Sequence, residues 1–349
     1  MRDIKDFTLE ELEGVLKGRG LPAFHAKQIF SWVYKKGASD FLQMSDLPAP
    51  LRKRLKEDFY IYTCEVAREL KSIDGTEKLL FKLKDKNYIE GVIIPAEGRI
   101  TGCVSSQIGC KFACSFCASG LAGFKRNLTA GEILEQVLFL KTYAPENKLT
   151  HIVFMGTGEP FDNYDNVMKA ARIINSEYAF NIGARRISIS TNGVVPGIEK
   201  LAAEKLQLEL SVSLHAAFDK TRSALMPINK KYPLKELLSA CKDYIKKTGR
   251  LVTFEYILIK GVNSGLKDAK NLSKMLKGLR LYKINLIPAN AIKELNIYPP
   301  NNPDILIFRS QLFKQGLNAI LRKSRGQDIE AACGQLRFKI ENETINRKA

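Results

Sequence analysis

The chain has 349 residues, with 55 Lys and Arg against 37 Asp and Glu, so its formal net charge is +18. A content of 45% hydrophobic and 26% charged residues is that of a globular protein and excludes a disulfide scaffold. The length allows one large core or two to three domains. The basic excess favours a polyanionic partner such as a nucleic acid, although a basic composition also serves solubility alone.

The beginning of the sequence, Met1 to Asp6, is charged and lacks the apolar run of a signal peptide. No apolar stretch reaches the roughly 18 residues that a membrane-spanning helix needs. We therefore expect a cytoplasmic protein that makes no use of a membrane. In that reducing compartment, the seven Cys are expected to bind metal or to perform redox chemistry rather than to form structural disulfides.

The first part of the chain is predicted to be helical. Apolar residues recur at helical spacing over 9–36, with a break at 20–22, which indicates a small helical accessory domain over 1–58. A β-rich connecting segment follows over 59–95, and the pair Asp74-Gly75 is a turn signal within it. The predicted strands of this antiparallel extension and of the entry into the main domain are 60–70, 78–83, 88–95 and 100–106.

Strands and helices alternate in the main domain, which predicts a parallel sheet. Helices are expected at 129–143, 163–174, 196–204, 233–247, 266–279 and 304–316, and strands at 151–155, 186–190, 208–214, 251–259, 283–287 and 319–322. About six βα units are too few for a closed eight-stranded barrel, and no G-x-G-x-x-G turn supports a doubly wound sheet. The α/β fold predicted is a partial (βα)6 barrel over 96–327, with a C-terminal segment over 328–349.

Three cysteines, Cys110, Cys114 and Cys117, lie in one loop with the spacing C-x-x-x-C-x-x-C. A structural zinc site needs four ligands, whereas an iron-sulfur cluster accepts a ligand from outside the protein at its remaining iron. The absence of a fourth nearby ligand therefore favours a cluster. A zinc site completed by a distant residue such as His151 or Cys333, or three incidental cysteines, are the alternatives.

Unusual residues also follow the predicted strands at their carboxyl ends. They are Gly156, Gly158 and Glu159 after the second strand, Ser190 and Asn192 after the third, Ser213 and His215 after the fourth, and Asn290 after the sixth. The carboxyl ends of barrel strands form one face, so we expect a shared small-molecule site there. Individually, the glycines and Ser190 are also typical of turns, and His215 of a buried core histidine.

Several motifs carry a family resemblance over nearly the whole chain. Besides the cysteine loop they are 105–107, 125–129, 155–160, 190–193, 213–216, 226–229 and 331–336. Together they resemble the RlmN/Cfr family of radical S-adenosylmethionine (SAM) methyltransferases, which modify RNA adenine. Pro160 is more similar to RlmN than to Cfr, while Thr157 departs from the Met that is more usual in the family.

The resemblance implies a 4Fe-4S cluster on Cys110, Cys114 and Cys117, with SAM at the fourth iron. It implies a SAM site made by Gly158, Glu159, Ser190, Ser213, Leu214, His215 and Asn290, in which Glu159 binds the methionine amine. It further implies that Cys333 accepts a methyl group from one SAM as S-methylcysteine and that a radical derived from a second SAM activates that methyl. Cys103 then resolves the RNA adduct through a transient disulfide with Cys333, and Glu90 is the proton acceptor.

The implied substrate is carbon 2 of adenine 2503 in 23S rRNA, with adenine 37 of tRNA as a second one. A flavodoxin-type reducing partner and a monomer are also expected. Methylation at carbon 8, as in Cfr, is the nearest rival, and a non-catalytic RNA-binding protein with structural zinc is a rival of another class. Basic clusters that suit RNA phosphates lie at 52–54, 125–126, 185–186, 230–231 and 322–325, although most such charges are typical of solvated surface.

Overall fold

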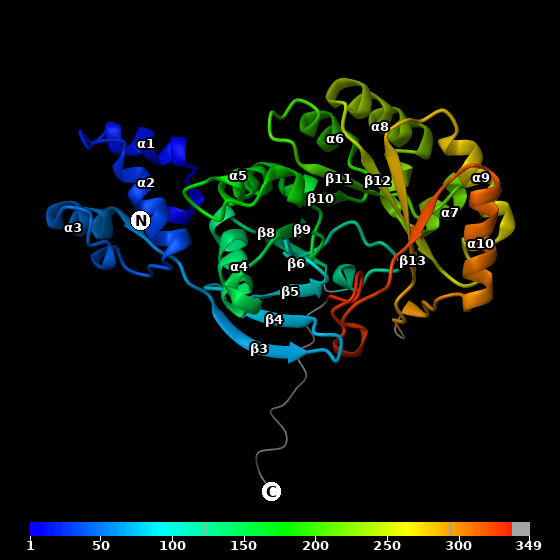
Figure 1. Ribbon diagram of the computed structural model, residues 1–349, viewed down its shortest axis with the longest axis horizontal. Coiled ribbons are helices and arrows are strands. Elements are labelled where there is room, and N and C mark those ends of the chain that lie inside the picture. The colour runs from blue at the N-terminus through cyan, green and yellow to red at the C-terminus, as the bar shows by residue number, and fades with distance from the viewer. Residues whose placement is uncertain (122, 293–294, 337–349) are drawn as a thin grey trace, which may run out of the picture.

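A computed structural model of the chain describes residues 1–121, 123–292 and 295–336 (Figure 1). Part of the predicted C-terminal segment, 337–349, lies outside the described residues. The first elements form a helical module beside the main sheet: α1 (Leu9–Lys17), α2 (His25–Phe30), a π-helical turn (Ser31–Lys35) and α3 (Ala49–Asp58). The predicted N-terminal helices are therefore present. No helix among the described residues is long and apolar enough to cross a membrane.

Ten strands form one curved sheet in the order β14-β13-β12-β11-β10-β9-β6-β5-β4-β3. Their bounds are β3 (Glu65–Lys71), β4 (Glu77–Lys82), β5 (Tyr88–Ala96), β6 (Arg99–Cys103), β9 (His151–Phe154), β10 (Ile187–Thr191), β11 (Glu209–Ser213), β12 (Val252–Leu258), β13 (Tyr282–Pro288) and β14 (Ala319–Leu321). Neighbours from β6 through β14 are parallel, and β3, β4 and β5 are antiparallel. The sheet has β3 and β14 at its edges, which confirms the predicted partial barrel.

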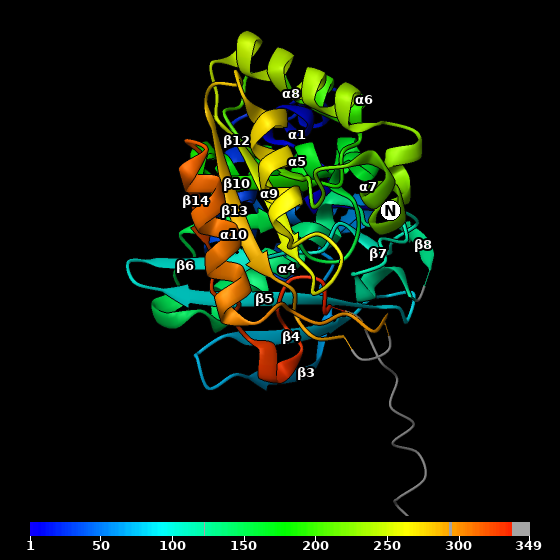
Figure 2. The same cartoon turned by 90° about the vertical axis from the view of Figure 1, so that its right-hand side faces the viewer.

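Helices cover the outside of the parallel strands (Figure 2). They are α4 (Ala130–Tyr143), α5 (Tyr164–Asn175), α6 (Val195–Leu201), α7 (Asp219–Leu225), α8 (Leu234–Thr248), α9 (Leu266–Leu276) and α10 (Asn302–Lys314). The sequence pattern missed α7, which is short. The predicted start of α4 is confirmed, because Thr129 Oγ1 accepts from the Glu132 amide and Glu132 Oε2 accepts from the Thr129 amide.

The alternation of side chains along each strand separates the core from the barrel interior. On β12, Phe254 and Tyr256 are fully buried in the core, and the Tyr256 ring lies 5.5 Å from that of Phe308 on α10. Thr253 and Glu255 point the other way and line cavities inside the barrel. The outer face of the sheet is thus the hydrophobic core, whereas its inner face is polar.

One predicted strand, 60–70, is wrong at its beginning. Phe59–Tyr60 (β2) pairs instead with Arg2–Asp3 (β1), and the following residues bind the N-terminal module. Tyr62 donates its amide to Asp3 Oδ1, and Lys5 donates to the Tyr62 carbonyl. These polar contacts hold 61–64 out of the sheet, so β3 begins only at Glu65.

The antiparallel strands extend the barrel sheet rather than forming a separate unit. Val92 of β5 pairs with Cys103 of β6, and Cys103 pairs in turn with Val153 of β9. The chain after Cys103 continues into β7 (Gln107–Gly109), which pairs with β8 (Phe124–Asn127). The loop between β7 and β8 carries the three spaced cysteines.

Residues 322–336 return from β14 across the open side of the sheet to the β3–β4 turn. The Asp328 carboxylate accepts from Ser72 Oγ at 2.6 Å, and Asp74 Oδ2 accepts from the Gly326 amide at 3.0 Å. Lys78 on β4 donates to the Glu330 carbonyl at 3.0 Å. This C-terminal segment therefore joins the β14 end of the sheet to the β3 end and covers the gap between them.

A buried ion pair fixes the N-terminal module to α4. Lys5 is 1% exposed and pairs with Glu135, whose other carboxylate oxygen accepts from the Cys64 amide. We expect Glu135→Gln to lower the free energy of unfolding by about 3 kcal/mol, because it leaves the Lys5 charge buried without its counter-charge. Urea denaturation measures this difference.

The matched control is Glu204→Gln, since Glu204 pairs at 2.9 Å with Arg172, which is 46% exposed. Solvent screens such a pair, so its loss is expected to cost less than about 1 kcal/mol. Equal losses in the two variants would contradict the docking role of the Lys5 pair.

Candidate active site

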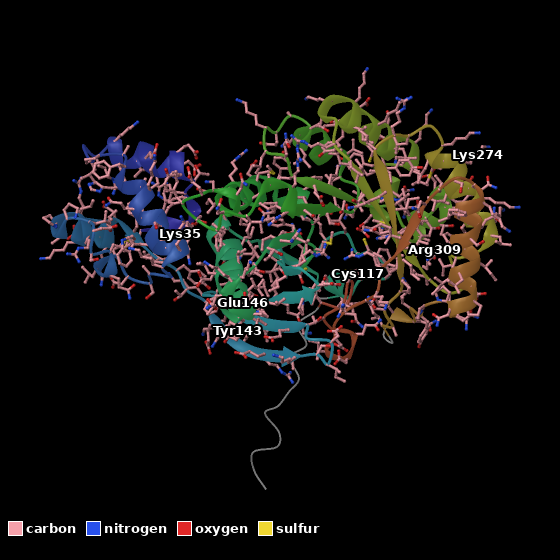
Figure 3. The ribbon with its side chains drawn as sticks, viewed as in Figure 1. Lys35, Cys117, Tyr143, Glu146, Lys274 and Arg309 are labelled. Carbon is pink, nitrogen blue, oxygen red and sulfur yellow. The ribbon has the colours of Figure 1, made fainter. Side chains whose placement is uncertain are left out.

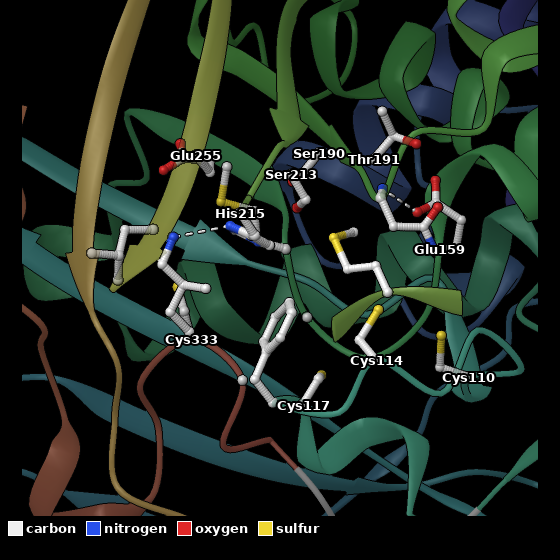
Figure 4. A pocket seen from close by; sticks show the side chains of 18 of the residues that line it. Cys110, Cys114, Cys117, Glu159, Ser190, Thr191, Ser213, His215, Glu255 and Cys333 are labelled. Atoms are coloured by element: carbon white, nitrogen blue, oxygen red, sulfur yellow. Dashed lines mark hydrogen bonds between the residues drawn. The ribbon is translucent and has the colours of Figure 1, made fainter. Parts of the chain in front are cut away.

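A cavity of about 160 Å³ lies at the carboxyl ends of the parallel strands, next to the cysteine loop (Figure 4). Its walls combine the cysteine loop, the ends of β9 to β12 and the C-terminal segment. Of the residues predicted from the sequence, it brings together Cys110, Cys114, Cys117, Gly158, Glu159, Ser190, Ser213, His215 and Cys333. We call this space the upper cavity.

The cysteine loop is closed at its base by backbone contacts that require glycine. Gly109 has φ +74°, and a Cβ there would lie 1.7 Å from the Gly123 carbonyl oxygen. That carbonyl accepts from the Cys110 amide at 3.1 Å, while the Ser115 amide donates to the Leu225 carbonyl at 2.9 Å. The loop is therefore held at both its start and its middle, and all three thiols line the upper cavity.

The donor set fits an iron-sulfur cluster. Cys110, Cys114 and Cys117 offer three sulfur ligands to one cavity, and each thiolate of such a cluster binds a different iron. Among residues 1–121, 123–292 and 295–336, no three His, Cys, Asp or Glu side chains surround a position suited to a single metal ion. Of the two distant zinc ligands considered above, His151 begins β9 at the opposite end of the barrel and does not line this cavity, whereas Cys333 does.

Glu159 is a buried carboxylate, 3% exposed, in the wall of the upper cavity. Its Oε1 accepts from the Phe161 amide at 3.0 Å and its Oε2 from the Asn192 amide at 2.7 Å. Burial raises the pKa of Glu159 to about 7 in spite of these hydrogen bonds. A carboxylate in this setting gains from a cationic partner, so it suits an ammonium group of a ligand.

The backbone before Glu159 approaches β7 closely. Gly158 has φ +110°, and a Cβ there would lie 2.6 Å from Gln107 Cβ. Gln107 in turn accepts the Glu159 amide through its Oε1 at 2.9 Å. Glycine is therefore required here, and the turn places the carboxylate beside the cysteine loop.

His215 combines the two alternatives that the sequence left open, a buried core histidine and a ligand contact. Its Nδ1 accepts from the Ile257 amide at 3.0 Å, so the neutral ring carries its proton on Nε2. Burial lowers the pKa of His215 to about 3. The ring stands edge-on to Phe116 with centroids 4.8 Å apart, and it lines the upper cavity. The His215 ring is therefore a fixed, uncharged part of the cavity wall whose Nε2–H can donate a hydrogen bond.

Arg222 is a structural residue of the site that the sequence reading missed. Its side chain is fully buried, and its guanidinium donates to the carbonyls of Asn192 at 2.8 Å, Ser213 at 3.0 Å and Leu214 at 3.1 Å. It also donates to Asn229 Oδ1 at 3.0 Å. The guanidinium thus fixes the ends of β10 and β11. Its only signal in the sequence is its place four residues before the 226–229 motif.

Two predicted SAM contacts have other partners in the structure. The Leu214 side chain is fully buried in the core, and its amide donates to the Glu255 carbonyl. Asn290 donates through Nδ2 to the Cys333 carbonyl at 2.9 Å and accepts from Gln327 Nε2 at 2.7 Å. Asn290 therefore holds the C-terminal segment in place.

Cys333 reaches the upper cavity because the C-terminal segment is tied to the cysteine loop. The Gly334 carbonyl accepts from the Ala118 amide at 2.7 Å, and the Leu336 carbonyl accepts from Ser119 Oγ at 2.8 Å. Cys333 is exposed and lines the upper cavity, and desolvation by the surrounding protein raises the pKa of its thiol.

Cys103 lies on the inner face of β6 and shares a second cavity with Cys333. Burial raises the pKa of Cys103 to about 12, and the nearby Cys333 contributes to this shift. The structure thus brings both predicted thiols of the working pair to one space inside the barrel.

Glu90 lies on the inner face of β5, below the C-terminal segment. Its Oε1 is 3.0 Å from Lys78 Nζ, and both side chains are buried. Val92, two residues further along the same face, packs with Cys103 and Ala331. Glu90 itself lines neither of the two cavities.

A second charged pair inside the barrel was also missed by the sequence reading. Glu255 is 5% exposed and lines both cavities; it accepts from Asn285 Nδ2 at 2.9 Å and lies 3.6 Å from Arg322. Burial raises the pKa of this carboxyl. A single acidic residue in the apolar strand 251–259 is the signal that could have identified it.

Comparisons with known proteins agree with this architecture. Residues 104–272 match the family model of the radical SAM superfamily, and residues 2–61 match that of the ribosomal RNA large subunit methyltransferase N-terminal domain. The crystal structure of a radical SAM methyltransferase from Sphaerobacter thermophilus superposes with a TM-score of 0.91 and is 46% identical, covering 97% of this chain and 99% of that one.

Curated relatives extend over the same length. A probable dual-specificity RNA methyltransferase RlmN from Clostridium perfringens (strain SM101 / Type A) is 49% identical over 338 residues, 97% of each chain. Another from Thermoanaerobacter sp. (strain X514) is 47% identical over 344 residues, 98% of this chain and all of its own. Members of the radical SAM superfamily use a 4Fe-4S cluster and SAM. The chain therefore belongs to the RlmN family of radical SAM RNA methyltransferases.

Proposed function

We propose that the protein methylates carbon 2 of adenine in 23S rRNA and in tRNA, using two SAM molecules and an S-methylcysteine at Cys333. The observation that carries this proposal is the position of Cys333, which lines the upper cavity with the three spaced cysteines and the second cavity with Cys103. A thiol at that junction is placed to take a methyl group on one side and to meet a resolving thiol on the other.

The walls of the upper cavity support SAM binding. Glu159 offers its carboxylate to the methionine amine, and Ser190, Ser213 and the Nε2 of His215 offer hydrogen bonds to the remainder of the molecule. Cys110, Cys114 and Cys117 would hold the cluster, which together with SAM supplies a carbon-centred radical. Phe116 and Ile257 add apolar surface to this space, which would limit water around the bound molecule.

The two remaining cysteines perform the transfer steps in this proposal. The Cys333 sulfur forms a bond to the methyl carbon as the carbon–sulfur bond of the sulfonium breaks, and the thiol proton leaves. The methyl carbon loses one hydrogen atom to the radical and joins the adenine. The Cys103 thiol then loses its proton and its sulfur attacks the Cys333 sulfur, so that a disulfide forms, the sulfur–carbon bond breaks and the released carbon takes up a proton as the methyl group of the product. The one electron that remains from the radical addition would return to the electron-supplying partner. Glu90, paired with Lys78 close to this position, would accept the ring proton.

Several features support RNA as the substrate. The charge of +18 suits phosphates, and exposed basic side chains include Lys53, Arg54, Arg186, Lys230 and Lys231. Arg126 instead pairs with Asp85 and Glu132, so the 125–126 cluster is partly neutralised. The relatives' names include dual specificity towards RNA.

The remaining expectations complete the proposal. Residues 1–58 would be an accessory domain, 59–95 a connecting β segment, 96–327 the catalytic barrel and 328–349 the segment that carries the methyl acceptor. The protein would act as a cytoplasmic monomer that receives electrons from a flavodoxin-type partner.

The test of the proposed function is nucleoside mass spectrometry. After anaerobic reaction with SAM, a reductant and unmodified 23S rRNA or tRNA, we expect 2-methyladenosine in both RNAs. Formation of 8-methyladenosine without 2-methyladenosine would contradict the choice of carbon 2. Purified protein that contains zinc, no iron and no SAM-cleaving activity would instead support the binding-protein rival.

The Glu159 carboxyl predicts how SAM affinity depends on pH. Because burial raises its pKa to about 7, the unliganded group is protonated below that pH, whereas the bound ammonium favours its carboxylate. SAM binding therefore releases a proton, and affinity should fall about tenfold between pH 8 and pH 6. Isothermal titration of the cluster-loaded protein measures this dependence. Glu159→Gln should bind more weakly and without the slope, and an unchanged slope in that variant would argue against the assigned contact.

A further inference from the structure

The barrel interior contains a second cavity of about 430 Å³, on the other side of Cys333 from the cysteine loop. It shares Met155, Glu255, Arg322 and Cys333 with the upper cavity. Apart from Cys103, the proposed chemistry uses none of the residues that line the rest of this space. We call it the lower cavity.

The lower cavity reaches the amino ends of the parallel strands. Arg99, His151 and Glu209 are the first residues of β6, β9 and β11, and all three line it. Arg185 also lines this cavity and lies two residues before the start of β10. Arg185, Arg99 and Glu209 are all exposed. Because the strands are parallel, these residues form one mouth at the end of the barrel opposite the cysteine loop.

Small polar side chains keep the lower cavity open. Closed barrels of this kind fill their interior with branched apolar residues. Here the inward positions of β10, β11 and β12 carry Ser188, Ser211 and Thr253, which line the cavity between the mouth and Cys333. Cys103 lines the same space from β6. A small molecule that enters at the mouth therefore meets both thiols of the working pair.

The charge of the lower cavity favours an anion. Its walls include four cationic side chains, Arg99, Arg185, Lys283 and Arg322, against the two carboxylates of Glu209 and Glu255. One carboxylate, Glu255, is already paired with Arg322 at 3.6 Å. The exposed arginines at the mouth would attract an anionic molecule from solvent.

We propose that the lower cavity is the route by which a small anionic thiol reduces the Cys103–Cys333 disulfide between turnovers. This inference rests on the proposed function, because that function oxidises the pair once per product. Two thiols of the reductant are consumed: the first attacks one sulfur of the disulfide and forms a mixed disulfide, and the second displaces the cysteine thiolate. The reductant leaves as its own disulfide, and Cys103 and Cys333 each gain a proton.

The route would leave the upper cavity undisturbed. The cluster and SAM are expected to occupy that cavity during the catalytic cycle, so reductant entering there would have to wait for SAM to leave. A path from the amino ends of the strands avoids this competition. Regeneration of the thiols would then proceed while SAM is bound.

The experiment measures the rate at which the oxidised pair is reduced in the cluster-loaded protein. One equivalent of an aromatic disulfide forms the Cys103–Cys333 bond anaerobically, and alkylation with peptide mass spectrometry follows the two thiols over time. Reductants are glutathione, an anionic thiol, and 2-mercaptoethanol, a neutral one. Each is used with and without saturating S-adenosylhomocysteine, which fills the SAM site and cannot donate a methyl group.

Reduction is expected to proceed at the same rate when S-adenosylhomocysteine is bound. The double variant Arg99→Glu, Arg185→Glu should slow glutathione about tenfold and 2-mercaptoethanol less than about twofold. Its matched control reverses two exposed lysines of the outer helices, Lys246→Glu and Lys274→Glu, and should leave both rates unchanged; Lys274 is marked on α9 in Figure 3. Loss of reduction when the SAM site is filled, or equal effects of the two double variants, would overturn the route.

A blocking variant gives an independent readout. Ser188→Phe places a ring in the middle of the lower cavity and should slow both reductants about tenfold, while S-adenosylhomocysteine affinity stays at the wild-type value and confirms that the site is folded. Ser39→Phe, on the exposed surface of the N-terminal module, is the control. Wild-type reduction rates in Ser188→Phe would refute the proposal. Failure of the two cysteines to form any disulfide would refute the resolving pair itself, which separates that outcome from failure of the route.

Discussion

The C-terminal segment is the constraint on which the proposed chemistry depends. An open sheet leaves its interior exposed along one side, and residues 322–336 cover that side by bonding to both ends of the sheet. Asp328 and Gly326 bind the β3–β4 turn, while Asn290 beyond β13 holds the Cys333 carbonyl. In the same segment, the Gly334 carbonyl accepts a hydrogen bond from the Ala118 amide of the cysteine loop. Cys333 is therefore placed by several independent contacts rather than by its own strand or helix.

Parallel strand ends supply the rest of the site, and buried charges hold them in position. Arg222 binds the carbonyls at the ends of β10 and β11, and the Glu159 carboxylate binds the Asn192 amide between them. Each buried charge is thus satisfied largely by backbone groups, which are fixed by the sheet. Burial also keeps the His215 side chain neutral. The upper cavity is consequently a preformed space in which the Glu159 carboxylate suits a cationic ligand.

Much of this structure could be predicted from local sequence signals. Alternating βα patterns gave the parallel strands, the Thr129–Glu132 capping box gave the start of α4, and residues after strands gave the common face of the site. The start of β3 and the role of Asn290 could not be predicted, because both depend on contacts with distant segments. The roles of Arg222 and Glu255 could not be predicted for a related reason. A buried charged residue is recognised only when its hydrogen-bond partners from other segments are known.

In the proposed chemistry, Cys333 carries the methyl carbon to RNA and Cys103 releases it. The most direct measurement uses Cys103→Ala with SAM, a reductant and 23S rRNA under anaerobic conditions. We expect a covalent RNA adduct to accumulate, and peptide mass spectrometry to map it to Cys333 through one additional carbon. Release of methylated RNA at the wild-type rate, with no adduct on Cys333, would contradict it.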